Sequence, residues 1–79
     1  MKILASARAN PASISFAELQ RLAETAGFAL VRTSGDHRIY AKRGVPEIIN
    51  IQPKGKNSAK PYQVRQVLDQ IDKYGIEVD

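Results

Sequence analysis

The feature that most restricts the fold of this 79-residue chain is a pair of segments that each carry a single apolar stripe. The first stripe consists of Phe16, Leu19, Leu22, Ala23 and Ala26. The second stripe consists of Val64, Val67, Leu68 and Ile71. Both follow the three-and-four spacing of one helix face. A helix with one apolar stripe must bury it against another element, so the two segments need an apolar surface to cover.

Sequence signals at the ends of the segments support two helices. Ser15 is a favourable N-cap, and Glu18 three residues later completes a capping box. Gly27 is the expected stop, which places the first helix at about residues 16–26. Pro61 suits the first position of the second helix.

Three short strands are predicted between the helices, with the sequences FALVRT, HRIYAK and IINIQ. The turn signals SGD and RGVPE between them are short enough for hairpins, so we expect an antiparallel meander. The sheet supplies the apolar surface that both helices cover on one face. The predicted fold is therefore α+β with the order α-β-β-β-α, which is the element order of double-stranded-RNA-binding domains.

Alternation along the middle strand assigns its side chains to the two faces of the sheet. Ile39 and Ala41 share one face, which we expect to lie under the helices. Arg38, Tyr40 and Lys42 share the other face, which we expect to be free of helices. A helix-free face with cations and a tyrosine fits a nucleic-acid platform. Outward positions on a strand are, however, ordinarily polar without any ligand.

The remaining segments give the expected domain organisation. Residues 1–14 show no periodicity and include a proline, so we expect a flexible leader. Residues 15–75 form one domain, and residues 76–79 form a short tail. No stretch is long and apolar enough for a membrane span or a signal peptide, and the chain has no cysteine. We therefore expect a cytoplasmic protein without disulfides, thiolate metal sites or a cysteine nucleophile.

Positive charge is concentrated in the middle of the chain. Residues 32–65 contain eight basic and two acidic residues, a net charge of +6, whereas the whole chain carries +4. Residues 66–79 contain one basic and four acidic residues. A basic segment followed by an acidic tail favours a polyanion such as RNA as the partner. A solvated surface without any partner would have the same composition.

The only histidine, His37, lies in the run SGDHRIYAKRG. Imidazole suits general acid–base catalysis because its ordinary pKa of about 6.5 lies near working pH. RNA can be cleaved without metal or cofactor, because its 2′-hydroxyl is a built-in nucleophile. Taken alone, however, a single histidine at the start of a strand is more often structural. Gly35 is expected to form the turn, and Asp36 either bonds its own backbone there or contacts His37.

Seven further residues are candidates for RNA contact. They are Arg38, Tyr40, Lys42, Arg43, Lys54, Lys56 and Lys60. The last three precede a predicted helix N-terminus, which itself attracts anions, so they could hold phosphates. They could equally keep a polar loop soluble. We expect no metal, cofactor or small-molecule site.

From about Ser15 to Ile71 the sequence resembles the HicA family, the small mRNA-cleaving toxins of HicA–HicB toxin–antitoxin pairs. The resemblance is carried by SFAELQRLAETAGF, by VRTSGDHRIY and by the short third strand before the closing helix. The histidine that the family uses for cleavage maps onto His37. The family often has serine at the position of Asp36 and a second histidine at that of Arg38. Neither difference removes the histidine used for cleavage.

This resemblance implies a metal-independent endoribonuclease that cleaves mRNA and is neutralised by a HicB-type antitoxin. The alternative is a non-catalytic module of the double-stranded-RNA-binding type. A third interpretation is an adaptor that uses its basic face against an acidic protein. Toxicity that requires His37, together with a neighbouring antitoxin gene, would distinguish the first function from the other two.

Overall fold

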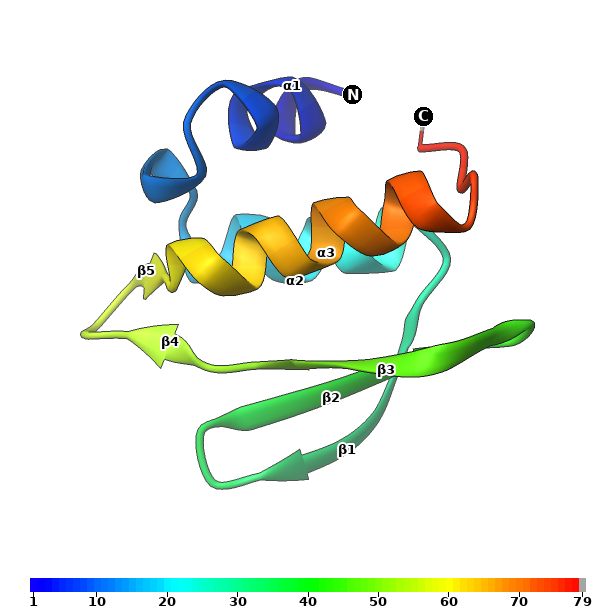
Figure 1. Cartoon of the computed structure of the whole chain (residues 1–79). Coiled ribbons are helices and arrows are strands. Elements are labelled where there is room, and N and C mark those ends of the chain that lie inside the picture. Colours follow the sequence, from blue (N-terminus) through cyan, green and yellow to red (C-terminus); the bar gives the residue numbers. More distant parts are fainter. Residues whose placement is uncertain (79) are drawn as a thin grey trace.

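The computed structural model describes residues 1–78, which are arranged in layers (Figure 1). The elements in chain order are α1 (Lys2–Ala9), the 3-10 helix η1 (Pro11–Ser13), α2 (Phe16–Thr25), β1 (Ala29–Ser34), β2 (His37–Lys42), β3 (Val45–Ile51), β4 (Pro53–Lys54), β5 (Ser58–Ala59) and α3 (Pro61–Lys73). The long strands form an antiparallel sheet in the order β1-β2-β3, and β4 pairs with β5. The predicted α+β fold, with its α-β-β-β-α order, is confirmed.

Helices α2 and α3 cover the same face of the sheet, as their single apolar stripes predicted (Figure 1). The capping box at the start of α2 is present: Ser15 Oγ accepts a hydrogen bond from the Glu18 backbone N–H, and Glu18 Oε1 accepts one from the Ser15 N–H. The buried side chains of α2 are Leu19, Leu22 and Ala23. Those of α3 include its whole predicted apolar stripe. Within residues 1–78, no helix is long and apolar enough to cross a membrane.

The prediction of which face β2 turns towards the helices was wrong. Tyr40, expected on the uncovered face, is only 1% exposed and belongs to the core beneath the helices. Its phenol ring offers more apolar area than any other side chain of the strand, and its hydroxyl accepts a hydrogen bond from Gln20 Nε2 at 3.3 Å. Ile39 therefore points to the uncovered face, where its cross-strand partners are Arg32 and Asn50. From Arg38 to Tyr40 the predicted alternation holds with the opposite orientation, and an irregularity interrupts the pairing between Tyr40 and Lys42.

The prediction of an irregular, loosely attached leader at residues 1–14 was also wrong. Residues 2–9 form α1, which lies on the side of α2 and α3 away from the sheet (Figure 1). Ala7 is fully buried, and Arg8 makes a bidentate ion pair with Asp72 of α3, with N–O distances of 3.0 and 2.7 Å. Only three apolar residues of α1, Ile3, Leu4 and Ala7, reach the core, so the stripe is too short to show as a periodicity.

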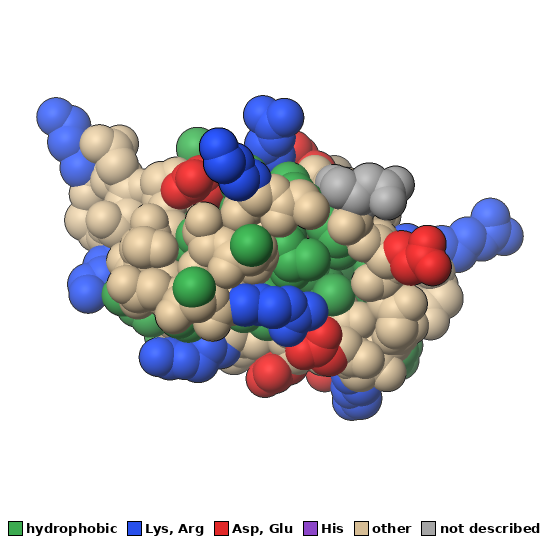
Figure 2. Space-filling view, turned by 90° about the horizontal axis from the view of Figure 1, so that it is seen from above, with side chains coloured by type: hydrophobic (Ala, Val, Ile, Leu, Met, Phe, Trp, Pro, Cys, Tyr) green, Lys and Arg blue, Asp and Glu red, His purple; other side chains and the backbone are tan. Residues whose placement is uncertain are grey.

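The face of the molecule that carries α1 has a mixed surface. Figure 2 shows acidic and basic side chains interspersed on it around an apolar centre, without the histidine. The hydrogen bond from Arg8 holds the pKa of Asp72 below its ordinary range. The α1 face therefore presents charges of both signs, among them the paired Arg8 and Asp72.

The lysine-rich segment after β3, expected to be a loop, forms the β4–β5 hairpin. Ala59 of β5 is buried, and its backbone N–H donates to the Ile14 carbonyl at 3.1 Å. The Phe16 N–H donates to the Asn57 carbonyl at 2.8 Å. These bonds fasten the hairpin to the start of α2. Two-residue strands are too short to produce an alternating pattern, so the sequence did not reveal them.

The two edges of the main sheet differ. At the outer edge of β3, Gln63 Oε1 of α3 accepts a hydrogen bond from the Gln52 N–H at 3.0 Å, and Gln70 Nε2 donates to the Ile48 carbonyl at 3.4 Å. Both glutamines are buried, and each bonds one backbone group along this edge. At the other edge, all the residues of β1 are exposed.

Candidate active site

His37 begins β2 at the end of a tight hairpin. Ser34 pairs with His37, so Gly35 and Asp36 are the two residues of the turn. Gly35 has φ +57°, and no other residue than glycine has positive φ among residues 1–78. A positive φ at the first turn position alone is the pattern of a type II′ turn, which requires glycine there. The predicted role of Gly35 as the turn residue that places His37 fits this backbone.

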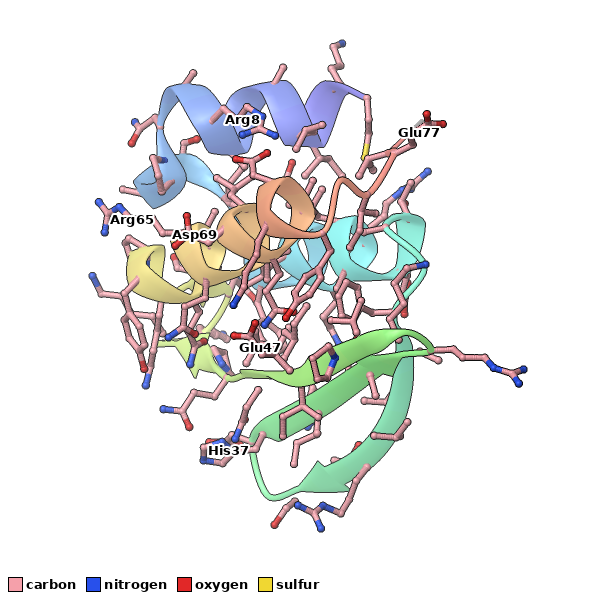
Figure 3. All side chains as sticks on the ribbon, turned by 45° about the vertical axis from the view of Figure 1, so that its right-hand side comes forward. Arg8, His37, Glu47, Arg65, Asp69 and Glu77 are labelled. Atoms are coloured by element: carbon pink, nitrogen blue, oxygen red, sulfur yellow. The ribbon has the colours of Figure 1, made fainter. Side chains whose placement is uncertain are left out.

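The His37 side chain lies on the face of the sheet that no helix covers. The pairing of β2 with β3 is regular from Arg38 to Tyr40, so alternation places His37 with Ile39 and opposite to the buried Tyr40. Figure 3 shows the ring projecting from the sheet on the side away from the helices. The residue is exposed and therefore open to a large substrate.

Asn50 of β3 holds the His37 ring. The distance from His37 Nδ1 to Asn50 Oδ1 is 2.9 Å. With the amide oxygen as the acceptor, Nδ1 carries the proton and the lone pair of Nε2 faces solvent. This tautomer leaves Nε2 free to accept a proton from a substrate. Sequence analysis missed Asn50, because no signal in the sequence fixed the register of β3 against β2.

The two neighbours of His37 in the chain serve the turn. Asp36 is exposed, and its carboxylate has no hydrogen bond to the His37 ring in the part of the chain that the structure describes. Arg38 Nη1 donates to the Gly35 carbonyl at 3.2 Å and lies 3.5 Å from the His37 carbonyl. The guanidinium of Arg38 therefore braces the hairpin that carries the histidine.

The lysine cluster, which we define as Lys54, Lys56 and Lys60, lies at the same end of the molecule as the β1–β2 turn (Figure 1). Arg38 pairs with Ile51, so Gln52 is level with His37 and Lys54 follows about 7 Å further along the chain. Lys54 pairs with Ser58, while the neighbouring pair contains the buried Ala59. Lys54 therefore points away from the core.

Other predicted contacts lie elsewhere. Lys42 ends β2 about 17 Å from His37, and Arg43 lies about 20 Å away in the turn after it, at roughly 3.4 Å per strand residue. Tyr40 is buried and is withdrawn from the set of predicted RNA contacts. Arg32, which was not singled out in the sequence, pairs with Ile39 and shares the uncovered face with His37. Arg32 could be assigned to the uncovered face only once the orientation of the sheet was known.

The arrangement combines an exposed imidazole, held through one nitrogen, with cations on both sides of it. Arg32 lies towards β1, and the lysine cluster lies beyond the end of β3. Within residues 1–78 there is no group of three or more histidine, aspartate or glutamate side chains that could hold a metal ion. These groups suit proton transfer next to a bound polyanion.

Comparison with known proteins gave one match. A family model described as the HicA toxin of bacterial toxin–antitoxin systems matches residues 16–72, which is 57 of the 79 residues. The matched region runs from the first residue of α2 into the last turn of α3 and includes His37. It leaves out α1. No curated protein and no solved structure matches the chain.

Proposed function

The chain belongs to the HicA toxin family, and from this membership we propose that it is an endoribonuclease that cleaves mRNA with His37 and without a metal ion. The observation that carries the proposal is the His37 ring, which is exposed on the uncovered face and held through Nδ1 by Asn50. The family membership makes the chain a toxin of a toxin–antitoxin system. The cleavage chemistry is inferred from the residues around His37.

In the proposed reaction, His37 Nε2 takes the proton of an RNA 2′-hydroxyl as the 2′-oxygen attacks the adjacent phosphorus. The new O2′–P bond forms as the P–O5′ bond breaks, which gives a 2′,3′-cyclic phosphate and a 5′-hydroxyl end. The leaving oxygen receives a proton from the imidazolium or from water. Lys54, or Lys56 in the adjacent turn, stabilises the negative charge that develops on the phosphorus oxygens.

The proposed RNA path crosses the end of the molecule where the β1–β2 turn and the β4–β5 hairpin meet. The lysine cluster holds phosphates on one side of His37, and Arg32 holds them on the other. Arg38 supports the turn and adds positive charge beside it. Arg43 contacts only RNA that continues along the sheet to the β2–β3 turn. Lys42 is left out of this path, because its Nζ lies beside Gly27 after the end of α2, on the helix side.

A toxin of this family works with an antitoxin, and we propose a HicB-type protein as the partner. Neutralisation requires the antitoxin to block access to His37, so its contact surface must reach the uncovered face. Because cations flank His37, an acidic surface on the partner would complement them. We propose that both proteins act in the cytoplasm, where mRNA is available.

The test is cleavage of a short labelled RNA by the parent protein and by His37→Ala, with and without a chelator. General acid–base groups contribute about 10²–10⁴-fold, so His37→Ala should lose this factor while it keeps its thermal unfolding midpoint. Glu24→Ala, on the exposed side of α2, is the matched control and should cleave like the parent. Binding without cleavage by the parent would favour the double-stranded-RNA-binding alternative. Loss of activity in chelator would contradict the metal-independent reaction.

A further inference from the structure

Tyr62, the second residue of α3, has a ring that is exposed but fixed. It is 52% exposed and is the only aromatic residue among the large exposed apolar side chains of residues 1–78. Its hydroxyl accepts a hydrogen bond from Gln63 Nε2 at 3.2 Å. An exposed aromatic ring that is already held loses little side-chain entropy when a flat ligand stacks on it.

A chain of hydrogen bonds connects Tyr62 to the strand next to His37. Gln63 holds the tyrosine hydroxyl with its amide nitrogen, and its amide oxygen accepts from the Gln52 N–H at 3.0 Å. Gln52 is level with His37 across β2 and β3, because Arg38 pairs with the preceding residue, Ile51. Hydrogen-bond lengths and strand spacing place the tyrosine hydroxyl on the order of 10–15 Å from the His37 backbone.

The surroundings of Tyr62 are cationic. Lys60 is the N-cap of α3, two residues before it, and Lys54 follows Gln52 by two residues in β4. An exposed aromatic ring among lysines has the composition of single-stranded nucleic-acid sites, in which bases stack on the ring and cations hold the phosphates. The other large exposed apolar residues, Leu30, Val31 and Ile48, are aliphatic and lie on the strands.

We propose that Tyr62 is a stacking platform for one base of the RNA substrate, one or a few nucleotides from the phosphate at His37. The inference rests on the proposed ribonuclease function and extends it to substrate recognition. Stacking accepts any base, so Tyr62 would contribute affinity and alignment more than sequence preference. The lysine cluster at the same end of the molecule would hold phosphates near the stacked base.

Binding is measured with an RNA whose 2′-hydroxyls are methylated, so that it cannot be cleaved. Replacement of a stacking ring by alanine costs about 1–3 kcal/mol, so Tyr62→Ala should bind about 5- to 150-fold more weakly. Tyr62→Phe keeps the ring and should bind within about a factor of three of the parent. Tyr74→Ala is the matched control, because Tyr74 lies at the other end of α3 with its hydroxyl on Glu47.

A fluorescent variant gives a second readout that does not depend on affinity. The chain has no tryptophan, so Tyr62→Trp would introduce a single indole at the proposed platform. Stacking on a base should quench its emission when the methylated RNA is added. Tyr74→Trp carries the same probe at the far end of the helix and should change little.

The outcomes separate the two proposals. If the parent binds RNA and Tyr62→Ala binds equally well, the stacking platform is wrong and the proposed ribonuclease function stands. Equal losses in Tyr62→Ala and Tyr62→Phe would also overturn stacking, since they would assign the effect to the hydroxyl. If the parent neither binds nor cleaves RNA, the proposed function fails first. An unquenched Tyr62→Trp that still binds would contradict the platform even if Tyr62→Ala does not fold.

Discussion

Asn50→Ala tests whether the amide that holds the His37 ring contributes to cleavage. The variant removes one hydrogen bond of 2.9 Å between two exposed side chains. Such a bond contributes about 0.5–1.5 kcal/mol, and each 1.36 kcal/mol is a factor of ten in rate. We therefore expect kcat to fall about 2- to 13-fold. Loss of the imidazole itself should cost about 10²–10⁴-fold, so the positioning residue and the catalytic residue are distinguishable.

Asn50→Asp separates positioning from charge. A carboxylate can accept the same hydrogen bond, but it also places a negative charge beside the ring and favours the imidazolium. The acid limb of the pH–rate profile should therefore move to higher pH in Asn50→Asp. In Asn50→Ala the maximum cleavage rate of the pH–rate profile should fall, and the acid limb should not move to higher pH.

The assay is single-turnover cleavage of a labelled RNA between about pH 5 and 8, with thermal unfolding as the control for folding. The double variant with His37→Ala and Asn50→Ala should be no slower than His37→Ala, because the amide acts only through the ring. Cleavage by Asn50→Ala at the parent rate would refute the reasoning. A further loss in the double variant would refute it as well, since Asn50 would then act independently of His37.

Three other predictions concern binding and stability. Replacement of all three lysines of the cluster by glutamine should flatten the slope of log affinity against log salt by about 2, at roughly 0.7 per lost phosphate contact. Arg43→Gln is the control and should change the slope little for a short RNA. Equal changes in the two variants would contradict the proposed path. In denaturant titrations, Tyr40→Phe should lower the free energy of unfolding by about 0.5–1.5 kcal/mol and Tyr40→Ala by about 3–5 kcal/mol. An unchanged free energy of unfolding in Tyr40→Ala would place the ring outside the core. The Arg8 hydrogen bond lowers the pKa of Asp72 in the folded state. The contribution of this ion pair to the stability of the fold should therefore be complete above the ordinary carboxyl pKa and be lost as pH falls through the lowered pKa. Hydrogen exchange of the α1 amides should show this acid-induced loosening in the parent and its absence in Asp72→Asn.

The sequence predicted the elements whose local signals agree with their packing. The capping box at Ser15, the proline at the start of α3 and the two apolar stripes each follow from a rule that acts within one or two helical turns. The hairpin that carries His37 was predicted because its glycine and the flanking strand patterns act over a few residues. These local rules were enough to place the one histidine at the start of a strand.

The errors arose where the answer depended on distant parts of the chain. Ile39 and Tyr40 are both buried, but only Tyr40 joins the core cluster beneath the helices, where Gln20 bonds its hydroxyl. Asn50 and Arg32 became candidates only when the strand register placed them beside His37 and Ile39. α1 was missed because its few apolar residues dock on a core built by distant parts of the chain, and Asp72, which pairs with Arg8, is 64 positions away.

The buried glutamines of α3 at the outer edge of β3 limit how copies of this chain can assemble. Strand-to-strand growth needs two open edges on each copy, so that every added subunit leaves a free edge for the next one. Here Gln70 bonds the Ile48 carbonyl of β3 and Gln63 bonds the Gln52 N–H just after it, whereas all the residues of β1 are exposed. Pairing through β1 would place two copies edge to edge around a twofold axis, and a strand added at the other edge would have to displace these two glutamine bonds.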